Sequence, residues 1–228
     1  MTDLSPPTTR KPTPGHVLRC ETPADCSGIL RPQFNLAIHP RTIPFAFVSK
    51  AAQDSGEAHF SFRLRVQTAD DSELTKALSR LEQSFSPEEA RWLQEDILFW
   101  TREFTALQPD VPVRVWLEEV THDNCRAYHA DFVTLRLLCT YRGPGTQWLD
   151  NETVAPLRDG RRLRGDTCCL QPQSLETGWV GLLKGERMEG NAGKGLVHRS
   201  PPLPEGKSRL LLRLDAGFRQ SPSQRTQK

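Results

Sequence analysis

Two histidines and one aspartate have the types and spacing of a metal site. His129 and Asp131 are separated by one residue, and His198 lies much further along the chain. Side chains two residues apart on a strand point to the same face, so one strand can present His129 and Asp131 together. Two imidazoles and one carboxylate hold Fe(II) on one side and leave positions open for substrate and oxygen. We therefore predict that His129, Asp131 and His198 bind one divalent ion, with Fe(II) preferred.

Two arginines near the C-terminus could bind an acidic co-substrate. Arg209 and Arg213 lie in a segment where leucines alternate with other residues, and a guanidinium group can hold a carboxylate through two parallel hydrogen bonds. If the leucines at 210, 212 and 214 filled a barrel, both arginines would point outward. If those leucines pack against helices, the arginines face the metal. We favour the second arrangement and predict that Arg209 and Arg213 bind a cofactor.

A second set of candidate ligands favours zinc. His122, Cys125 and His129 are spaced by three and four residues, and Asp131 or one of Cys168 and Cys169 could complete the set. Thiolate is a soft ligand that favours zinc over Fe(II), although a free cysteine is more often a small buried hydrophobe. His122 and Cys125 thus keep open the alternative of a non-enzymatic zinc-binding protein.

Composition narrows the class of protein. A chain of 228 residues with a net charge of +2 fits a single domain and gives no electrostatic support for nucleic-acid binding. No apolar run is long enough to span a membrane, and residues 1–15 lack the apolar core of a secretory signal. We expect a cytoplasmic protein with reduced cysteines, one domain over 16–218, and disordered tails over 1–15 and 219–228.

The periodicity of apolar residues predicts helices near 72–85 and 87–107. Ser86 is a suitable N-cap, Pro87 occupies the first helical position, and Glu89 completes a capping box. The apolar stripe of the second helix predicts that it covers a sheet. This stripe consists of Leu93, Ile97, Trp100, Phe104 and Leu107.

After Pro109 the pattern changes to short alternating segments that predict strands. His129 and Asp131 share parity with the apolar residues from Val133 to Tyr141, so a continuous strand over 128–141 would place the ligands on its apolar face. The glycine-rich segment 190–195 precedes a strand and is predicted to be a flexible flap. The fold class we expect is α+β, with an N-terminal helical layer (about 70–108) packed on a C-terminal double-stranded β-helix, or jelly roll (about 112–215). Predicted strands cover 34–38, 59–66, 113–117, 128–141, 179–183, 196–198 and 210–214.

Three stretches resemble a bacterial family known as domain of unknown function 1826. They are CRAYHAD (125–131), LRLLCTYRGPGTQWL (135–149) and VHRSPP (197–202), and the similarity extends over about 16–218. Genes of that family often lie near zinc-uptake or zinc-chaperone genes, so the resemblance implies a link to zinc homeostasis rather than a defined reaction.

The second half also resembles, more distantly, the iron- and 2-oxoglutarate-dependent dioxygenases. The order of His129, Asp131, the turn at 143–146, His198 and Arg209 matches the order of motifs in that superfamily. The resemblance implies that the two histidines and the aspartate bind iron and that Arg209 binds 2-oxoglutarate. Leu211 departs from the pattern, because many members have a small hydroxyl residue there. The substrate, a small molecule or a protein, is not specified, and pocket candidates by proximity in sequence are Tyr128, Arg136, Tyr141 and Trp148.

Overall fold

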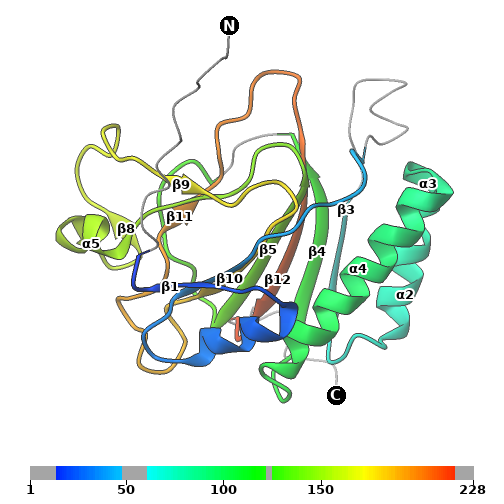
Figure 1. Cartoon of the computed structure of the whole chain (residues 1–228), viewed down its shortest axis with the longest axis horizontal. Coiled ribbons are helices and arrows are strands. Elements are labelled where there is room, and N and C mark those ends of the chain that lie inside the picture. Colours follow the sequence, from blue (N-terminus) through cyan, green and yellow to red (C-terminus); the bar gives the residue numbers. More distant parts are fainter. Residues whose placement is uncertain (1–13, 48–60, 122–124, 219–228) are drawn as a thin grey trace, which may run out of the picture.

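The computed structural model describes residues 14–47, 61–121 and 125–218. Their largest element is a seven-stranded sheet with the order β1-β2-β10-β5-β12-β4-β3 (Figure 1). The pairing of β1 with β2 is parallel, and the other neighbours in this sheet are antiparallel. The strands are β1 (Val17–Arg19), β2 (Leu36–His39), β3 (Ser61–Val66), β4 (Val113–Val120), β5 (Leu135–Arg142), β10 (Val180–Lys184) and β12 (Arg209–Ala216).

Helices cover one face of this sheet. They are η1 (Pro23–Leu30), α2 (Ser72–Ser79), α3 (Leu81–Ser84) and α4 (Pro87–Ala106). α4 begins with the predicted capping box of Ser86 and Glu89. The first predicted helix is divided into α2 and α3 at Arg80, and Asp71 caps its start by accepting from two backbone N–H groups.

The helices and the sheet share one apolar core. Leu93, Ile97, Trp100 and Phe104 of α4 are buried in the same cluster as the odd-numbered residues of β5 from Leu135 to Tyr141. Leu210, Leu212 and Leu214 of β12 belong to this cluster as well. The leucine face of β12 therefore packs against the helices, which is the arrangement favoured above for this segment.

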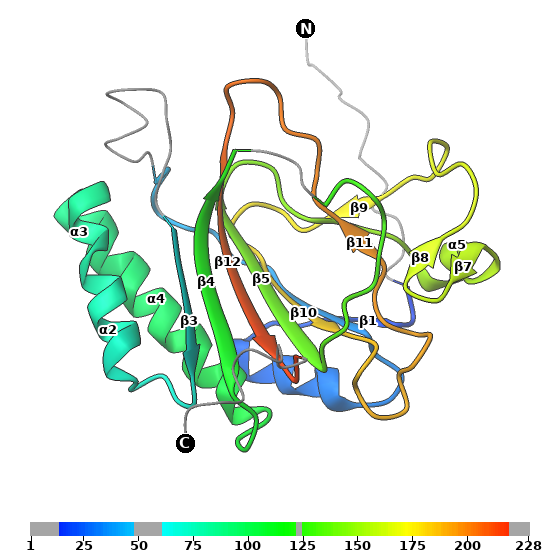
Figure 2. The same cartoon turned by 180° about the vertical axis from the view of Figure 1, so that it is seen from behind.

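The opposite face of the sheet carries a smaller sheet with the order β11-β6-β9 (Figure 2). Its strands are β6 (Gln147–Trp148), β9 (Gln173–Ser174) and β11 (His198–Arg199). Between the two sheets lies a second apolar cluster, to which β1, β2, β5, β10 and β12 contribute. α5 (Asn151–Val154), η2 (Ala155–Leu157) and the hairpin of β7 (Arg158–Asp159) and β8 (Arg162–Leu163) lie beyond this small sheet.

The fold is thus a mixed α/β structure built around a large, mostly antiparallel sheet. The large sheet begins before residue 112, where the jelly-roll core was expected to start, because β1, β2 and β3 precede α2, α3 and α4 and pair into one sheet with the strands that follow them. A single domain over 16–218 stays a prediction, and the expected tails lie almost entirely outside the described residues. Within the described residues, no helix is long and apolar enough to cross a membrane.

Candidate metal centre

The segment that carries His129 and Asp131 is separated from β5 by a bend. Residues 132–134 form bends and β5 begins only at Leu135, so the predicted continuous strand over 128–141 is wrong. Leu135 faces the helices, whereas His129 lines a pocket on the other face of the sheet together with Arg136. The bend therefore takes the His129–Asp131 segment away from the apolar face that simple alternation predicted.

Backbone hydrogen bonds place the two histidines side by side. His129 N donates to His198 O at 3.0 Å, and His198 N donates to His129 O at 2.9 Å. The carbonyl of Asp131 accepts from the N–H of Glu186 at 2.8 Å. Gly185 is required at this approach, because a Cβ there would lie 2.2 Å from the carbonyl oxygen of Val133. All three candidate ligands are thus positioned by backbone contacts.

The side chains of His129, Asp131 and His198 converge. Each offers a ligand atom, and these atoms lie within 4.8 Å of one another. The Nε2 atom of His129 lies 3.6 Å from Oδ1 of Asp131, and Nε2 of His198 lies 3.2 Å from Oδ2. The fold thus brings together the three residues that the sequence predicted as ligands.

The hydrogen bonds of both imidazoles leave Nε2 available to a metal. Nδ1 of His129 contacts the carbonyl of Ala127 at 2.9 Å, and Nδ1 of His198 contacts the carbonyl of Leu196 at 3.1 Å. A carbonyl can only accept, so in each ring Nδ1 carries the proton and the neutral ring has its lone pair on Nε2. A backbone carbonyl in this place is the usual orienting partner of a metal-binding histidine.

Asp131 is held as a carboxylate. Its side chain is 11% exposed, and Nη1 of Arg136 lies 2.6 Å from Oδ2. Burial would raise the pKa of Asp131, but the positive charge of Arg136 and the contacts with His198 and His129 hold that pKa well below its usual value. Oδ2 is buried in contact with Arg136 and His198, and Oδ1 lies 3.6 Å from Nε2 of His129.

Arg136 bridges two buried carboxylates. Besides Asp131, it pairs with Asp215 of β12 through Nε to Oδ1 at 2.5 Å and Nη2 to Oδ2 at 2.8 Å. Burial would lower the pKa of Arg136, but the two aspartates raise it. Among the four pocket candidates named by proximity in sequence, Arg136 lines this pocket, whereas Tyr141 lies on the helix-facing side.

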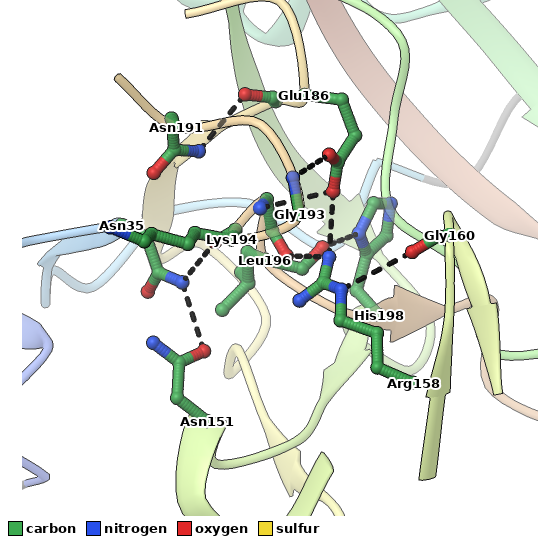
Figure 3. Close-up of polar contacts among 12 residues, drawn as sticks. Asn35, Asn151, Arg158, Gly160, Glu186, Asn191, Gly193, Lys194, Leu196 and His198 are labelled. Atoms are coloured by element: carbon green, nitrogen blue, oxygen red, sulfur yellow. Dashed lines mark hydrogen bonds and ion pairs between the residues drawn. The ribbon is translucent and has the colours of Figure 1, made fainter. Parts of the chain in front are cut away.

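The glycine-rich segment 190–195 is tied to the fold, in contrast to the flexible flap expected from its sequence. The carboxylate of Glu186 accepts from Gly193 N at 2.5 Å and Gly195 N at 3.1 Å, and it pairs with Arg158 at 2.7 Å (Figure 3). Arg158 also donates to the carbonyl of Gly195. This segment leads directly into Leu196, whose carbonyl orients His198.

Arg209 lies in the same pocket as the two histidines. It is 1% exposed, and its Nη2 donates to the hydroxyls of Thr140 and Thr146 at 3.0 and 3.2 Å. Burial lowers the pKa of Arg209 to about 10, so the group remains charged at neutral pH. Its Nε is buried without an acceptor among the described residues. A buried cation that contacts only hydroxyls is an expensive arrangement unless an anion completes it.

Arg213 and Leu211 also line this pocket, whose empty space is about 340 Å³ including the part open to solvent. The hydroxyl groups beside Arg209 come from Thr140 of β5 and from Thr146, which lies between β5 and β6. The sequence marked Thr146 only as part of the turn at 143–146 and gave no role to Thr140 or Glu186, because only the pairing of distant segments brings these residues to the site.

The alternative zinc ligands are only partly described. Cys125 is exposed and lines the pocket, but within the described residues it does not join the cluster of ligand atoms formed by His129, Asp131 and His198. His122 lies outside the described residues. Cys168 and Cys169 are exposed and do not line this pocket.

Comparison with known proteins gives the family. Residues 20–215 match the model of a family described as a protein of unknown function, DUF1826, and the chain belongs to that family. No curated protein matches its sequence.

Solved structures give a fold relationship. The chain is similar to dioxygenase for auxin oxidation 1 from Arabidopsis thaliana in complex with 2-oxoglutarate, with a TM-score of 0.51, 11% identity, and coverage of 92% of this chain and 97% of that chain. A full-length Neurospora crassa protein in complex with alpha-KG and 5-formyluracil also matches, with a TM-score of 0.43, 12% identity, and coverage of 88% of this chain and 83% of that chain. The similarity to the auxin dioxygenase shows that the folds are alike.

Proposed function

We propose that this protein is a mononuclear Fe(II)- and 2-oxoglutarate-dependent oxygenase. The observation that carries the proposal is the convergence of two imidazole Nε2 atoms and a carboxylate beside a pocket that Arg209 also lines. Arg209 is buried, donates to two hydroxyls and forms no salt bridge among the described residues, although the charge of Glu118 acts on it. The similarity in fold to a dioxygenase described as a 2-oxoglutarate complex supports this proposal. Under this proposal, the large sheet and the β11-β6-β9 sheet of this chain are the two layers of a distorted double-stranded β-helix.

His129, Asp131 and His198 would hold the metal. The donor set of two neutral nitrogens and one carboxylate oxygen suits Fe(II) and leaves coordination positions open. Oδ2 of Asp131 is shared with Arg136, so this carboxylate would bind the metal through one oxygen while the arginine holds its orientation. The carboxylate also balances part of the charge of a divalent ion.

Arg209 would bind the distal carboxylate of 2-oxoglutarate. Its guanidinium group is held by Thr140 and Thr146, and the hydroxyl of Thr146 is positioned to contact the same carboxylate. A pre-positioned, buried arginine loses little side-chain entropy on binding and gains a charge-assisted pair in a low dielectric. Arg213 lines the same pocket and is the substitute for Arg209 in this role.

When bound, Fe(II) and 2-oxoglutarate together would activate dioxygen for the oxidation of a substrate, with loss of carbon dioxide from the co-substrate. The chain contributes three things to this chemistry. Asp131 and the histidines fix the metal, Arg209 aligns the co-substrate, and the apolar wall formed by Leu138 and Leu211 limits the access of water.

The direct test is an anaerobic titration of the Fe(II)-loaded protein with 2-oxoglutarate, in which chelation of the metal gives a visible charge-transfer band. We expect the band in the wild type and its loss in a His129→Ala/His198→Ala double variant, together with loss of bound iron. His39→Gln is the matched control, because His39 is a buried histidine of β2 that does not line this pocket. Bound metal without a band would contradict the 2-oxoglutarate assignment.

Zinc homeostasis is the alternative role, and metal analysis distinguishes it. Tight binding of zinc that is lost in a Cys125→Ser variant and retained in Arg209→Met would support a zinc-binding protein instead of an oxygenase. Under the oxygenase proposal Cys125→Ser leaves iron binding intact, because Cys125 does not belong to the ligand cluster.

A further inference from the structure

The face of the large sheet that carries Arg213 also carries two rows of charged and aromatic residues across neighbouring strands. In one row, the strand register places Arg63 of β3 opposite Trp116 of β4, and Trp116 opposite Arg213 of β12. In the next row, Arg65, Arg114, Asp215 and Arg136 follow one another across β3, β4, β12 and β5. Neighbouring strands lie about 4.8 Å apart, so each row is a continuous strip of side chains.

Both rows run from the metal centre to the open edge of the sheet. Arg136 contacts Asp131 and Arg213 lines the metal pocket, whereas Arg63 and Arg65 are exposed on β3. The apolar cluster beneath the small sheet draws residues from β1, β2, β10, β5 and β12, and the small sheet lies on that side (Figure 2). The strip over β3 and β4 is thus continuous with the pocket without being covered by the β11-β6-β9 layer.

Trp116 organises the arginines of this strip. The guanidinium carbon of Arg213 lies 3.8 Å from the centre of the Trp116 ring, and that of Arg63 lies 4.6 Å from it. Arg114 contacts the same ring at 6.0 Å and the ring of Phe218 at 3.6 Å. A guanidinium group stacked on an aromatic ring keeps its N–H edge available for an anion and is held in one orientation before binding.

Positive charge on this face exceeds negative charge. The six arginines at 63, 65, 114, 136, 209 and 213 share the face with the carboxylates of Glu118, Asp131 and Asp215, of which the two aspartates are paired with Arg136. The buried Nε of Arg213 has no acceptor among the described residues. The crowding affects Arg114, since burial lowers its pKa and the charges of Arg63, Arg65 and Arg213 lower it further, against the opposing charge of Asp215.

We propose that the substrate of this site is a small-molecule acid, whose carboxylate or phosphate group binds to Arg63 and Arg213 over Trp116 while the remainder extends into the metal pocket. This inference rests on the proposed oxygenase function and deepens it by naming the substrate class. We infer a small molecule because the pocket that Arg213 shares with the two histidines has an empty space of only about 340 Å³, including the part open to solvent. Stacked arginines bind planar or tetrahedral anions through paired hydrogen bonds, which gives both affinity and orientation.

The test uses benzoate and phenyl phosphate, which differ only in the anionic group, and benzamide as their neutral counterpart. Binding is measured calorimetrically on protein saturated with Fe(II) and 2-oxoglutarate under anaerobic conditions, so that the co-substrate already occupies its own site. We expect benzoate, phenyl phosphate or both to bind with a stoichiometry of one per protein. Benzamide should bind at least tenfold more weakly than the acid that binds. The acid that binds more tightly identifies the anionic group.

Arg63→Gln and Arg213→Gln should each weaken binding of that acid at least fivefold. Arg63 is exposed, so its replacement does not endanger folding, and this variant should retain the charge-transfer band with 2-oxoglutarate. Arg80→Gln/Arg91→Gln removes two exposed arginines from the helical layer and should bind the acid like the wild type.

Two outcomes overturn the substrate assignment: neither acid binds, or the acid binds equally well to wild type and Arg63→Gln. Failure of the oxygenase proposal is a separate result, because it is seen as the absence of the charge-transfer band before any acid is added. In that event the same titrations on metal-free protein still decide whether the strip binds anions.

Discussion

Arg136 lies 2.6 Å from the carboxylate of Asp131 on one side and forms a two-point contact with Asp215 on the other. The candidate metal ligand is thus coupled to β12, an inner strand of the large sheet that also presents Arg209 and Arg213. The guanidinium group of Arg136 therefore links the candidate metal ligand Asp131 to the strand that carries the proposed anion-binding residues.

Replacement of Arg136 by leucine should lower the free energy of unfolding of the metal-free protein by about 3–5 kcal/mol, because it leaves two buried carboxylates without a cation. Urea unfolding monitored by circular dichroism measures the change. Arg136→Lys retains the charge and should lose less. A divalent ion should stabilise the Arg136→Leu protein more than the wild type, since it restores a positive charge beside Asp131. Equal stability of Arg136→Leu and wild type would contradict this role.

Arg209→Met should separate stability from binding. Methionine fills a similar volume without a buried charge, so we expect the free energy of unfolding to stay the same or to rise by about 1–2 kcal/mol. The same variant should bind 2-oxoglutarate at least tenfold more weakly, as measured by anaerobic calorimetry. A large loss of stability with unchanged binding would mean that Arg209 serves the fold and not the co-substrate.

Glu186→Ala should weaken metal binding about 10- to 100-fold, the range seen when outer-shell partners of metal ligands are removed. The variant removes the acceptor of Gly193 N and Gly195 N, so the backbone of the segment before His198 is no longer held in one conformation. Competition with a chelator measures the affinity, and amide hydrogen exchange of 190–196 reports the loosening. Glu189→Ala, an exposed residue of the same connection, is the control and should change neither quantity.

Because of Tyr141, we expect the folded protein to lose stability at alkaline pH. Burial raises its pKa well above the usual value, and the neighbouring Asp96, whose Oδ2 accepts from the hydroxyl at 2.7 Å, raises it further. Above pH ~10 the unfolded chain loses this proton and the folded chain keeps it, so the free energy of unfolding falls as pH rises, by up to about 1.4 kcal/mol per pH unit.

The chain contains two tyrosines, so a Tyr128→Phe variant leaves Tyr141 as the sole tyrosine. In that variant, ultraviolet absorbance should show no tyrosinate near pH 10 while the protein is folded, and ionisation of about half of the tyrosine there in urea. A further Tyr141→Phe change should remove the corresponding part of the alkaline slope. If Tyr141 of the folded protein ionised at the ordinary pKa of tyrosine, the interpretation would be refuted.

The sequence predicted those features that depend on local patterns. The capping box at Ser86 and Glu89 marks the start of α4, and the alternation of leucines over 210–214 predicts which face of β12 meets the helices. His129 and Asp131 could be paired by their spacing alone. His198 was predicted as the third ligand from its residue type and its place after the His-x-Asp pair, but no local pattern predicts that two segments so far apart in the chain meet.

Other features depend on contacts between distant segments. Thr140 and Thr146 reach Arg209 only because β5, the turn after it and β12 are neighbours in space. β1 and β2 complete the far edge of the sheet, although they precede α2, α3 and α4 in sequence. The Fe(II) and 2-oxoglutarate assignments, and the zinc alternative with its ligands at 122 and 125, stay predictions that the experiments above decide.

The candidate metal site depends on the number of residues in the bend over 132–134 more than on which residues these are. Residues 131 and 135 would share a face in an unbroken strand, and the bend is what places Asp131 and Leu135 on opposite sides of the sheet. Phe132 is 46% exposed, so substitutions there should be readily accepted. Insertion or deletion of one residue would instead rotate the aspartate out of the pocket while leaving β5 intact. Among relatives of this chain, a gap at this position would mark those that keep the fold but lack the candidate metal site.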